Sequence, residues 1–212
     1  MSRPNVSRLR LPLLYAIVDP LDTNRTPEAL ATAYLEGGAR LLQLRLKGVS
    51  SRALYDAALA IRAATHAAGA LFVVNDRPDV AAAVGADGVH LGQDDVPVAV
   101  ARAVLGPDRF VGISTHDLDE ARAAVTAGAD YLGVGPVYDT TSKVGALPAR
   151  GFDLVRAVRA LTDRPLVAIG GIDATTAPAV RDAGADAIAM IGALARAAEP
   201  AAAVRAVLAA LG

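Results

Sequence analysis

The stretch DLDEARAAVTAGADYLGVGPV (117–137) contains one complete unit of the pattern that decides the fold. Residues 118–127 place apolar side chains at helical spacing, and acidic residues stand where this segment starts, as is typical of a helix N-terminus. Gly128-Ala129-Asp130 follows, and a glycine just past the last turn takes the left-handed backbone that ends many helices. The apolar run 131–137 then favours a buried strand. The stretch therefore predicts a helix, a tight turn and a strand in succession.

The same unit recurs along the chain. Gly-Ala-Asp returns at 85–87 and 184–186, and Gly37-Gly38-Ala39 and Gly69-Ala70 mark the corresponding turns of earlier units. Short apolar runs predict strands at 13–19, 41–47, 71–76, 88–92, 110–115, 131–137, 166–171 and 187–192. Dividing 212 residues among eight units gives about 26 residues for each strand with its helix. We predict an α/β fold, a single (β/α)8 TIM barrel. A doubly wound open sheet is the alternative, but no GxGxxG pattern follows the first strand.

The composition indicates one folded domain over residues 1–212, with residues 1–11 as an N-terminal extension. A hydrophobic fraction of 53% with 20% charged residues supplies a core and excludes a disordered chain. The formal net charge of −1 argues against a non-specific nucleic-acid binder or a protein of anionic membrane surfaces. Because the chain has no cysteine, disulfides, thiolate metal sites and a cysteine nucleophile are excluded.

The N-terminus has a basic start and a short apolar run, residues 11–18, that superficially resembles a secretion signal. Asp19 ends this run and no small-residue cleavage site follows, so we interpret the run as the first buried strand. No stretch approaches the roughly 20 apolar residues that a membrane-spanning helix needs. We expect a cytoplasmic protein with no nucleic-acid or membrane partner, and a homo-oligomer is left open.

The two lysines, Lys47 and Lys143, stand out because the other 19 of the 21 basic residues are arginine. A compact ammonium group and a planar guanidinium group are not interchangeable. A chain that uses arginine for ordinary surface cations therefore makes its two lysines candidates for specific roles.

Polar residues alternate with leucines at the end of the second predicted strand. Gln43, Arg45 and Lys47 point to one face, and the intervening leucines point to the other, where the helices must lie. The three polar side chains are therefore predicted to line the barrel near the carboxyl ends of its strands, where barrel enzymes carry their chemistry. A buried ion network is the alternative. Since no two acidic neighbours are evident, we expect a ligand to supply the anion for the two cations.

Carboxylates follow the next two strands. Asn75-Asp76 ends the third strand, and Asp94-Asp95 follows the fourth. Mg²⁺ prefers one or two carboxylates together with phosphate oxygens of a substrate, so Asp76 and Asp95 predict a shared magnesium site. The alternative for Asp94 or Asp95 is capping of the following helix. Asp79 is interpreted as a first-turn residue that complements the helix dipole.

Ser114-Thr115-His116 ends the fifth strand. Capping of the next helix, by Thr115 or Asp117, is the alternative to a functional role. No base pattern near Ser114 indicates a hydrolase nucleophile. His90 is interpreted as a satisfied core residue.

A long segment, 135–151, follows the sixth strand, and loops of this length inside a compact repeat are commonly functional. Three hydroxyl residues at 140–142 and Lys143 predict an oxyanion binder, with a solvated loop as the alternative. Gly170-Gly171 and Ile191-Gly192 end the last two strands, where backbone amides can approach a phosphate. We expect two anion sites, one for a diphosphate and one for a monophosphate. No activated nucleophile is evident, which favours chemistry in which a diphosphate leaves.

The motifs YAIVD, QLRLK, VNDRPDVA, GVHLGQDD, GISTH, GPVYDTTSK and AIGGI, in this order and spacing, resemble the thiamine-phosphate synthase (thiamine-phosphate pyrophosphorylase) family over residues 13–194. The resemblance implies a (β/α)8 barrel and a transferase. The family joins hydroxymethylpyrimidine diphosphate to hydroxyethylthiazole phosphate, forming thiamine phosphate and releasing pyrophosphate. We expect a Mg²⁺-assisted dissociative substitution in which Ser114 is a hydrogen-bond partner of the reacting centre.

The resemblance also implies roles for individual residues. It places catalytic roles on Arg45, Lys47, Ser114 and Lys143. It places pyrimidine and diphosphate contacts on Gln43, Leu44, Arg45, Leu46, Lys47, Asn75, Ser114 and Lys143. It places thiazole-phosphate contacts on Thr140, Thr141, Ser142, Gly171, Ile191 and Gly192, and the Mg²⁺ ligands on Asp76 and Asp95.

Three departures from the family pattern leave alternatives open. Gly192 stands where the family often has serine, and Asp139 stands where it often has proline. Residues 147–151 also resemble the related thiazole tautomerases, although a well-known tautomerase pattern has histidine at the position of Pro136 and such relatives can lose the second aspartate, here Asp95. A tautomerase-like isomerase and a non-catalytic barrel that binds phosphorylated ligands are the alternatives.

Overall fold

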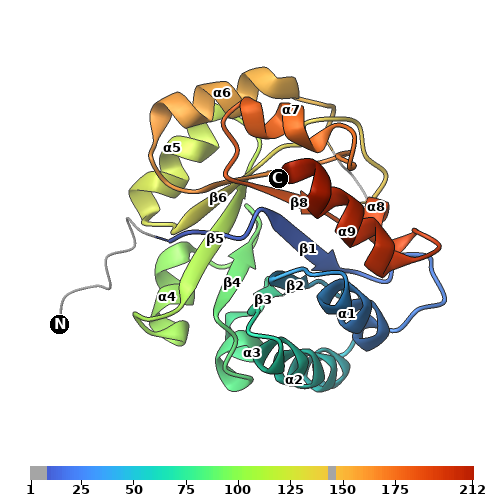
Figure 1. The fold of residues 1–212 in the computed structure, drawn as a ribbon. Helices are drawn as coiled ribbons and strands as arrows, with labels where there is room; N and C mark the ends of the chain where they lie inside the picture. The colour runs from blue at the N-terminus through green and yellow to red at the C-terminus, as the bar shows by residue number, and fades with distance from the viewer. Residues whose placement is uncertain (1–8, 143–146) are drawn as a thin grey trace.

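The computed structural model describes residues 9–142 and 147–212 of the chain, and Lys143 lies outside the described residues. Eight parallel strands form a closed barrel in sequence order, with β8 paired to β1 (Figure 1). Helices surround the barrel and follow the strands in alternation. The predicted (β/α)8 barrel is therefore confirmed.

The strands span short segments at the centre of each unit. They are β1 Leu14–Val18, β2 Leu41–Leu44, β3 Leu71–Asn75, β4 Gly88–Leu91, β5 Phe110–Thr115, β6 Tyr131–Val134, β7 Leu166–Ile169 and β8 Ala187–Met190. The helices are α1 Pro27–Glu36, α2 Ser51–Ala67, α3 Pro78–Ala83, α4 Val98–Leu105, α5 Leu118–Ala127, α6 Gly151–Leu161, α7 Ala177–Asp182, α8 Gly192–Ala195 and α9 Pro200–Leu211. Two helices, α8 and α9, follow the last strand.

All eight predicted strands exist, but most end earlier than the sequence indicates. β2 ends at Leu44 instead of residue 47, and β6 ends at Val134 instead of residue 137. After β6, residues 135–137 remain buried, and after β2 the polar–apolar alternation continues with Leu46 packed on the outer core, although these residues lie outside the strands. At Pro136 the missing N–H also removes a hydrogen bond that a strand would need. The residues beyond these ends form the mouth of the barrel.

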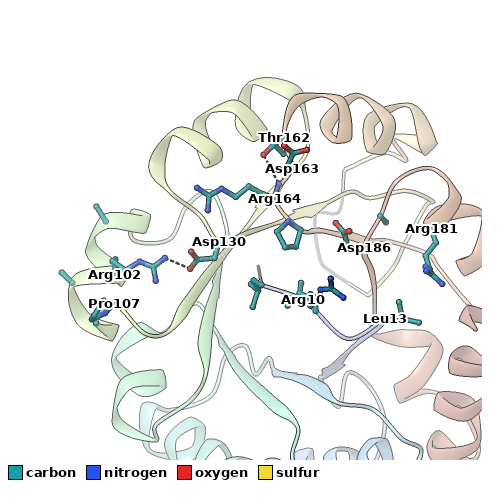
Figure 2. Close-up of a pocket in the computed structure, with 17 residues that line it drawn as sticks. Arg10, Leu13, Arg102, Pro107, Asp130, Thr162, Asp163, Arg164, Arg181 and Asp186 are labelled. Atoms are coloured by element: carbon teal, nitrogen blue, oxygen red, sulfur yellow. Dashed lines mark hydrogen bonds and ion pairs between the residues drawn. The ribbon is translucent and has the colours of Figure 1, made fainter. Parts of the chain in front are cut away.

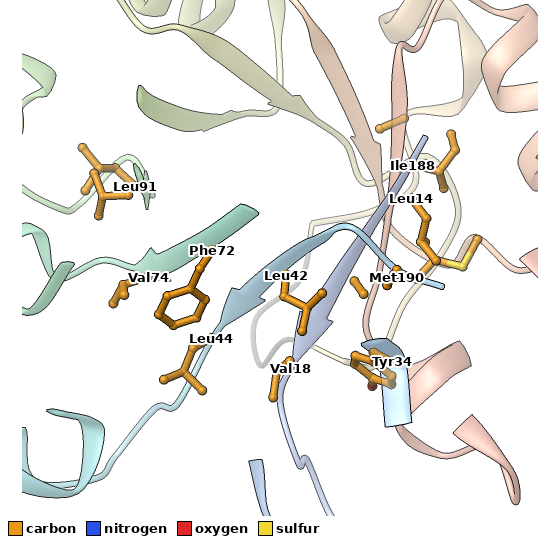
Figure 3. Close-up of a cluster of buried hydrophobic side chains, with 14 of the residues drawn as sticks. Leu14, Val18, Tyr34, Leu42, Leu44, Phe72, Val74, Leu91, Ile188 and Met190 are labelled. Carbon is orange, nitrogen blue, oxygen red and sulfur yellow. The ribbon is translucent and has the colours of Figure 1, made fainter. Parts of the chain in front are cut away.

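The core has two layers because successive strand residues point to opposite faces. The outer layer packs strands against helices and includes Leu14, Leu42, Leu44, Phe72 and Met190 (Figure 3). The inner layer fills the barrel and consists of the buried cluster Tyr15, Ile17, Leu41, Val73, Tyr131, Val167, Ala187 and Ala189. Leu9 and Leu11 pack against this inner cluster, so the described part of the N-terminal extension contacts the barrel.

Helix starts use short polar caps, as the sequence indicates. Thr26, Ser50 and Asp117 each accept the backbone N–H three residues later and thereby satisfy a donor that has no partner within the helix. Asp117, and not Thr115, caps α5. Thr115 instead donates to the carbonyl oxygen of Gly133 at 3.0 Å and ties β5 to β6.

The aspartates of the three Gly-Ala-Asp repeats share one structural role at the amino ends of the strands. Each carboxylate accepts the backbone N–H of a residue on the neighbouring strand and pairs with an arginine. Asp87 bonds Phe72 and Arg62, Asp130 bonds Val111 and Arg102, and Asp186 bonds Leu166 and Arg159. Figure 2 shows Arg102 reaching Asp130. The repeat is therefore both a helix stop and a clamp on the barrel base.

A cavity of about 1260 Å³ lies at this amino-terminal end of the barrel, lined by residues such as Arg10, Pro107 and Arg164 (Figure 2). None of the predicted site residues lines it. Within residues 9–142 and 147–212, no helix combines the length and apolarity needed to cross a membrane.

Candidate active site

A second cavity, of about 710 Å³, opens at the carboxyl ends of the strands, and all eight strands contribute to its lining. It brings together thirteen of the residues predicted from the sequence. These are Gln43, Arg45, Lys47, Asn75, Asp76, Asp95, Ser114, Thr140, Thr141, Ser142, Gly171, Ile191 and Gly192. The side chains of Leu44 and Leu46 do not line it, because they alternate with the polar residues and pack against the outer core.

Both cations at the end of β2 have carboxylate partners. Arg45 pairs with Asp19, and Lys47 pairs with Asp76. The expectation that these cations lack acidic neighbours is therefore wrong. Asp19 and Asp76 follow β1 and β3, the strands on either side of β2, and adjacency in the barrel brings them together although they are distant in sequence.

Asp76 and Asp95 face each other at the mouth. Burial and the hydrogen-bonding Asp76 carboxyl raise the pKa of Asp95 above its usual value, while the Gly92 N–H and Lys47 act in the opposite direction. Asp95 accepts the Gly92 N–H at 2.7 Å. It does not cap α4, whose N-cap residue, Pro97, offers no side-chain bond. Two carboxyl groups so close to each other form an arrangement that a cation would stabilise.

Asp76 holds an unusual backbone conformation. Its φ of 62° lies in the left-handed region, which non-glycine residues adopt rarely and at some cost. Its N–H donates to the carbonyl oxygen of His90 at 2.8 Å, which fixes this turn to the end of β4. The strained turn aims the Asp76 carboxylate toward Lys47 and Asp95 and not along the strand.

Ser114 lies beside a histidine. His90 Nε2 is 2.9 Å from Ser114 Oγ, and His90 Nδ1 is 2.8 Å from the Tyr131 hydroxyl. Both ring nitrogens of His90 have partners, as predicted, but His90 is only partly buried and lines the cavity, so it is not a core residue. The expectation that no base lies near Ser114 is wrong. His90 pairs with Gly112 in the β4–β5 register, so Ser114 stands two residues farther along the same inner face.

The hydroxyl segment after β6 meets the glycine turns that follow β7 and β8. The Ser142 N–H donates to Thr140 Oγ1 at 3.2 Å. Gly171 has φ of +62°, and a Cβ there would lie 2.5 Å from the carbonyl oxygen of Asp139, so only glycine fits. The Asp139 carboxylate accepts the Ala149 N–H at 3.1 Å and is thus engaged by the returning loop.

Arg196 occupies the space that a side chain at position 192 would take. A Cβ on Gly192 would lie 2.5 Å from Arg196 Nη1 and 2.7 Å from Ser142 Oγ. Arg196 Nε pairs with Asp22 at 3.0 Å, which holds the guanidinium at the cavity. The sequence alone does not distinguish Arg196 from the other 18 arginines. Its relevance becomes visible only in the structure, where the end of α8 brings its guanidinium over Gly192.

Comparisons with known proteins show the family to which this barrel belongs. A family model described as thiamine monophosphate synthase matches residues 14–194. The chain is 47% identical over 193 residues to a thiamine-phosphate synthase of Chloroflexus aurantiacus, covering 91% of this chain and 89% of the relative. It is 46% identical over 193 residues to a thiamine-phosphate synthase of Moorella thermoacetica, covering 91% and 92%.

A solved structure of a thiamine phosphate pyrophosphorylase from Pyrococcus furiosus superposes with a TM-score of 0.85 at 37% identity, covering 93% of this chain and 94% of that one. The matched region contains all eight strands and both sides of the cavity at their carboxyl ends. The chain belongs to the thiamine monophosphate synthase family.

Proposed function

We propose that this chain, a thiamine-phosphate synthase by its family, joins the two phosphorylated heterocycles in the cavity at the carboxyl ends of its strands. The observation that carries the proposal is that one cavity contains two separate sets of anion-binding groups. Arg45 and Lys47 follow β2, whereas Ser142 follows β6 and Arg196 lies beyond β8, and all four line the cavity. Two phosphorylated substrates need such an arrangement for their reacting atoms to meet between the two sets.

The carboxylates at the mouth fit a magnesium ion. Asp76 and Asp95 form a close pair, and no cluster of three or more metal-ligating side chains occurs among the described residues. Mg²⁺ is held in many enzymes by one or two carboxylates, with water and substrate phosphate oxygens completing its shell. We therefore assign Asp76 and Asp95 to the ion. When bound, Mg²⁺ would neutralise charge on the departing diphosphate.

The cations at the end of β2 would assist this departure. Arg45 and Lys47 are held by Asp19 and Asp76, so each is already oriented when a diphosphate arrives. Donors placed in advance where negative charge develops are the largest contribution in many enzymes. Lys143 is proposed to add a third cation, and its position lies outside the described residues.

The reaction itself would be dissociative. The bond between the pyrimidine methylene carbon and the diphosphate oxygen breaks, and its electron pair leaves with the diphosphate. The lone pair of the thiazole nitrogen then forms the new carbon–nitrogen bond. Ser114, which His90 contacts, would be a hydrogen-bond partner of the pyrimidine and not a nucleophile.

The thiazole phosphate would bind on the opposite side of the cavity. Thr140, Thr141 and Ser142 offer hydroxyls, and Gly171, Ile191 and Gly192 offer backbone close to the ligand. Arg196 adds a guanidinium at the place where Gly192 lacks a side chain. Guanidinium groups bind phosphate through paired, charge-assisted hydrogen bonds, so Arg196 would replace a contact that a residue with a hydroxyl would give.

The expected partners are therefore the two phosphorylated small molecules. We also propose a cytoplasmic location, because a chain without cysteine forms no disulfide in an oxidising compartment.

A coupling assay tests the proposal directly. Purified protein is mixed with both phosphorylated heterocycles and Mg²⁺, with and without a chelator, and thiamine phosphate and pyrophosphate are measured. We expect equal amounts of both products with Mg²⁺ and a large loss with chelator. Isomerisation of the thiazole substrate without Mg²⁺ would instead favour a tautomerase, and binding without turnover would favour a non-catalytic barrel.

A further inference from the structure

A continuous chain of hydrogen bonds crosses the interior of the barrel beneath the cavity. Gln43 Nε2 donates to the Tyr15 hydroxyl at 2.8 Å, and this hydroxyl is 3.0 Å from that of Tyr131. The Tyr131 hydroxyl contacts His90 Nδ1 at 2.8 Å, and His90 Nε2 contacts Ser114 Oγ at 2.9 Å. These hydrogen bonds therefore connect two cavity-lining residues, Gln43 on β2 and Ser114 on β5, which the family resemblance places among the contacts of the pyrimidine diphosphate.

Two of the hydrogen-bonded residues are tyrosines that occupy space in the apolar interior of the barrel. Tyr15 and Tyr131 are 1% and 0% exposed and lie in the inner cluster of otherwise aliphatic side chains. A Cβ on Gly112 would lie 2.0 Å from Cζ of Tyr131, so only glycine leaves space for the phenol ring. The His90 ring stacks on this phenol with centroids 5.5 Å apart. Phenylalanine would fill the same volume without two buried hydroxyls that need partners.

The donors and acceptors along the chain follow one direction. An amide nitrogen can only donate, so the Tyr15 oxygen accepts from Gln43. If the Tyr15 hydrogen is to have an acceptor, it goes to Tyr131, and the Tyr131 hydrogen then goes to His90 Nδ1. A neutral imidazole that accepts at Nδ1 carries its hydrogen on Nε2, which donates to Ser114 Oγ.

This direction decides what the cavity offers to a ligand. Since Ser114 accepts from His90, its own hydrogen is available for a group in the cavity. Since Gln43 donates through Nε2, its Oε1 remains available as an acceptor. If every hydrogen bond in this chain ran in the opposite direction, the two roles would be exchanged. Gln43 would then offer an amide donor to the cavity, and Ser114 would offer a hydroxyl acceptor.

We propose that Tyr15, Tyr131 and His90 are positioning residues that set this polarity, and that the polarity selects a ring with an exocyclic amino donor and a ring-nitrogen acceptor. The proposal rests on the proposed function, since the amino-substituted pyrimidine is the substrate with that pattern. Hydrogen bonding discriminates strongly when the wrong analogue leaves a buried polar group without its partner. Tyr131, at the centre of these hydrogen bonds and outside the cavity lining, thus affects recognition without touching the substrate.

Tyr131→Phe is the decisive variant, because Tyr131 is buried and does not line the cavity. Its matched control is Tyr34→Phe, which removes a hydroxyl from a phenol that is equally buried but lies in the outer core, where its oxygen has no hydrogen-bond partner. Both variants are first compared with wild type by circular dichroism and thermal melting. If Tyr131→Phe does not fold, Tyr15→Phe interrupts the same chain at the adjacent link.

Three measurements distinguish positioning from a structural role. We expect Tyr131→Phe to lower kcat/KM for the pyrimidine diphosphate about 2- to 10-fold, the range for one hydrogen bond, and to leave KM for the thiazole phosphate unchanged. Selectivity for the amino substrate over an analogue with an oxo group in its place should fall by a similar factor. Combining Tyr131→Phe with Ser114→Ala should add little further loss, because both act through one group.

The tautomer of His90 gives a readout that does not depend on turnover. Ring-nitrogen chemical shifts should show hydrogen on Nε2 of His90 in the wild type and a mixture of tautomers in Tyr131→Phe. The protein has only three histidines, so these signals can be assigned. Unchanged shifts together with unchanged amino selectivity would overturn the proposal. If the wild type shows the expected tautomer but forms no thiamine phosphate, the proposed function fails separately.

Discussion

Replacing Asp130 with alanine should test the clamp at the barrel base most sharply. Its side chain is 3% exposed, accepts the Val111 N–H at 2.7 Å and pairs with Arg102. A buried N–H left without an acceptor costs about 1–3 kcal/mol. The Arg102 side chain is 22% exposed and keeps the carbonyl oxygen of Arg109, so losing its ion pair should add only about 1 kcal/mol.

The expected destabilisation for Asp130→Ala is therefore about 3 kcal/mol in the free energy of unfolding. For a chain of this length, that corresponds to a fall of roughly 6–12 °C in Tm. Asp130→Asn keeps an acceptor oxygen and should cost about half as much. Urea unfolding followed by circular dichroism gives these free energies, with an unchanged m-value indicating that the unfolded state is comparable.

The matched control is Asp186→Ala. Asp186 makes the same two contacts, but its side chain is 47% exposed, so water can replace what is removed and the cost should be about 1 kcal/mol. The folded fraction of each variant should retain normal kcat, because the clamp lies at the opposite end of the barrel from the cavity. A loss at Asp186 equal to or larger than that at Asp130 would refute the argument from burial.

Three further predictions concern the cavity and the packing beneath it. Asp95→Asn should lower turnover about 100-fold at limiting Mg²⁺ with little loss of fold, whereas the exposed Asp94→Asn should not, and a Mg²⁺ titration of the initial rate decides between them. Arg196→Ala should raise KM for the thiazole phosphate about tenfold with an unchanged KM for the pyrimidine diphosphate. Arg205→Ala, an exposed arginine on α9, should change neither constant in the same steady-state assay. Gly112→Ala should destabilise the fold by at least about 1–3 kcal/mol in urea unfolding, because the new methyl would overlap a buried phenol ring, and a neutral result would contradict the packing described.

The sequence was sufficient for the fold because every unit repeats the same local signals. A glycine that stops a helix, an aspartate after it and an apolar run can all be recognised within about ten residues. The mouth of the barrel was harder to predict. Asp19 and Arg45 meet only because β1 and β2 are neighbours, and His90 meets Ser114 only through the β4–β5 register. Such contacts depend on strand adjacency and depth along the barrel, which residue spacing does not contain.

Arg196 could not be predicted from the sequence for a different reason. Its importance depends on the absence of a side chain at Gly192 and on a short helix that turns its guanidinium back toward the cavity. Neither the glycine nor the arginine is informative alone. The sequence identified the departure at Gly192, and the folded chain was needed to show what fills the space.

The paired phenols inside the barrel also have a spectroscopic consequence. The chain has no tryptophan and five tyrosines, so phenol absorbance and emission dominate its near-ultraviolet signal. Burial raises the pKa of Tyr15, Tyr34 and Tyr131, so these three should resist ionisation in alkali for as long as the barrel remains closed. Tyr15 also lines the cavity, with its ring centroid 6.0 Å from that of Tyr131. The enzyme thus contains an optical reporter, free of any label, for the opening of its interior and for the arrival of a ligand above it.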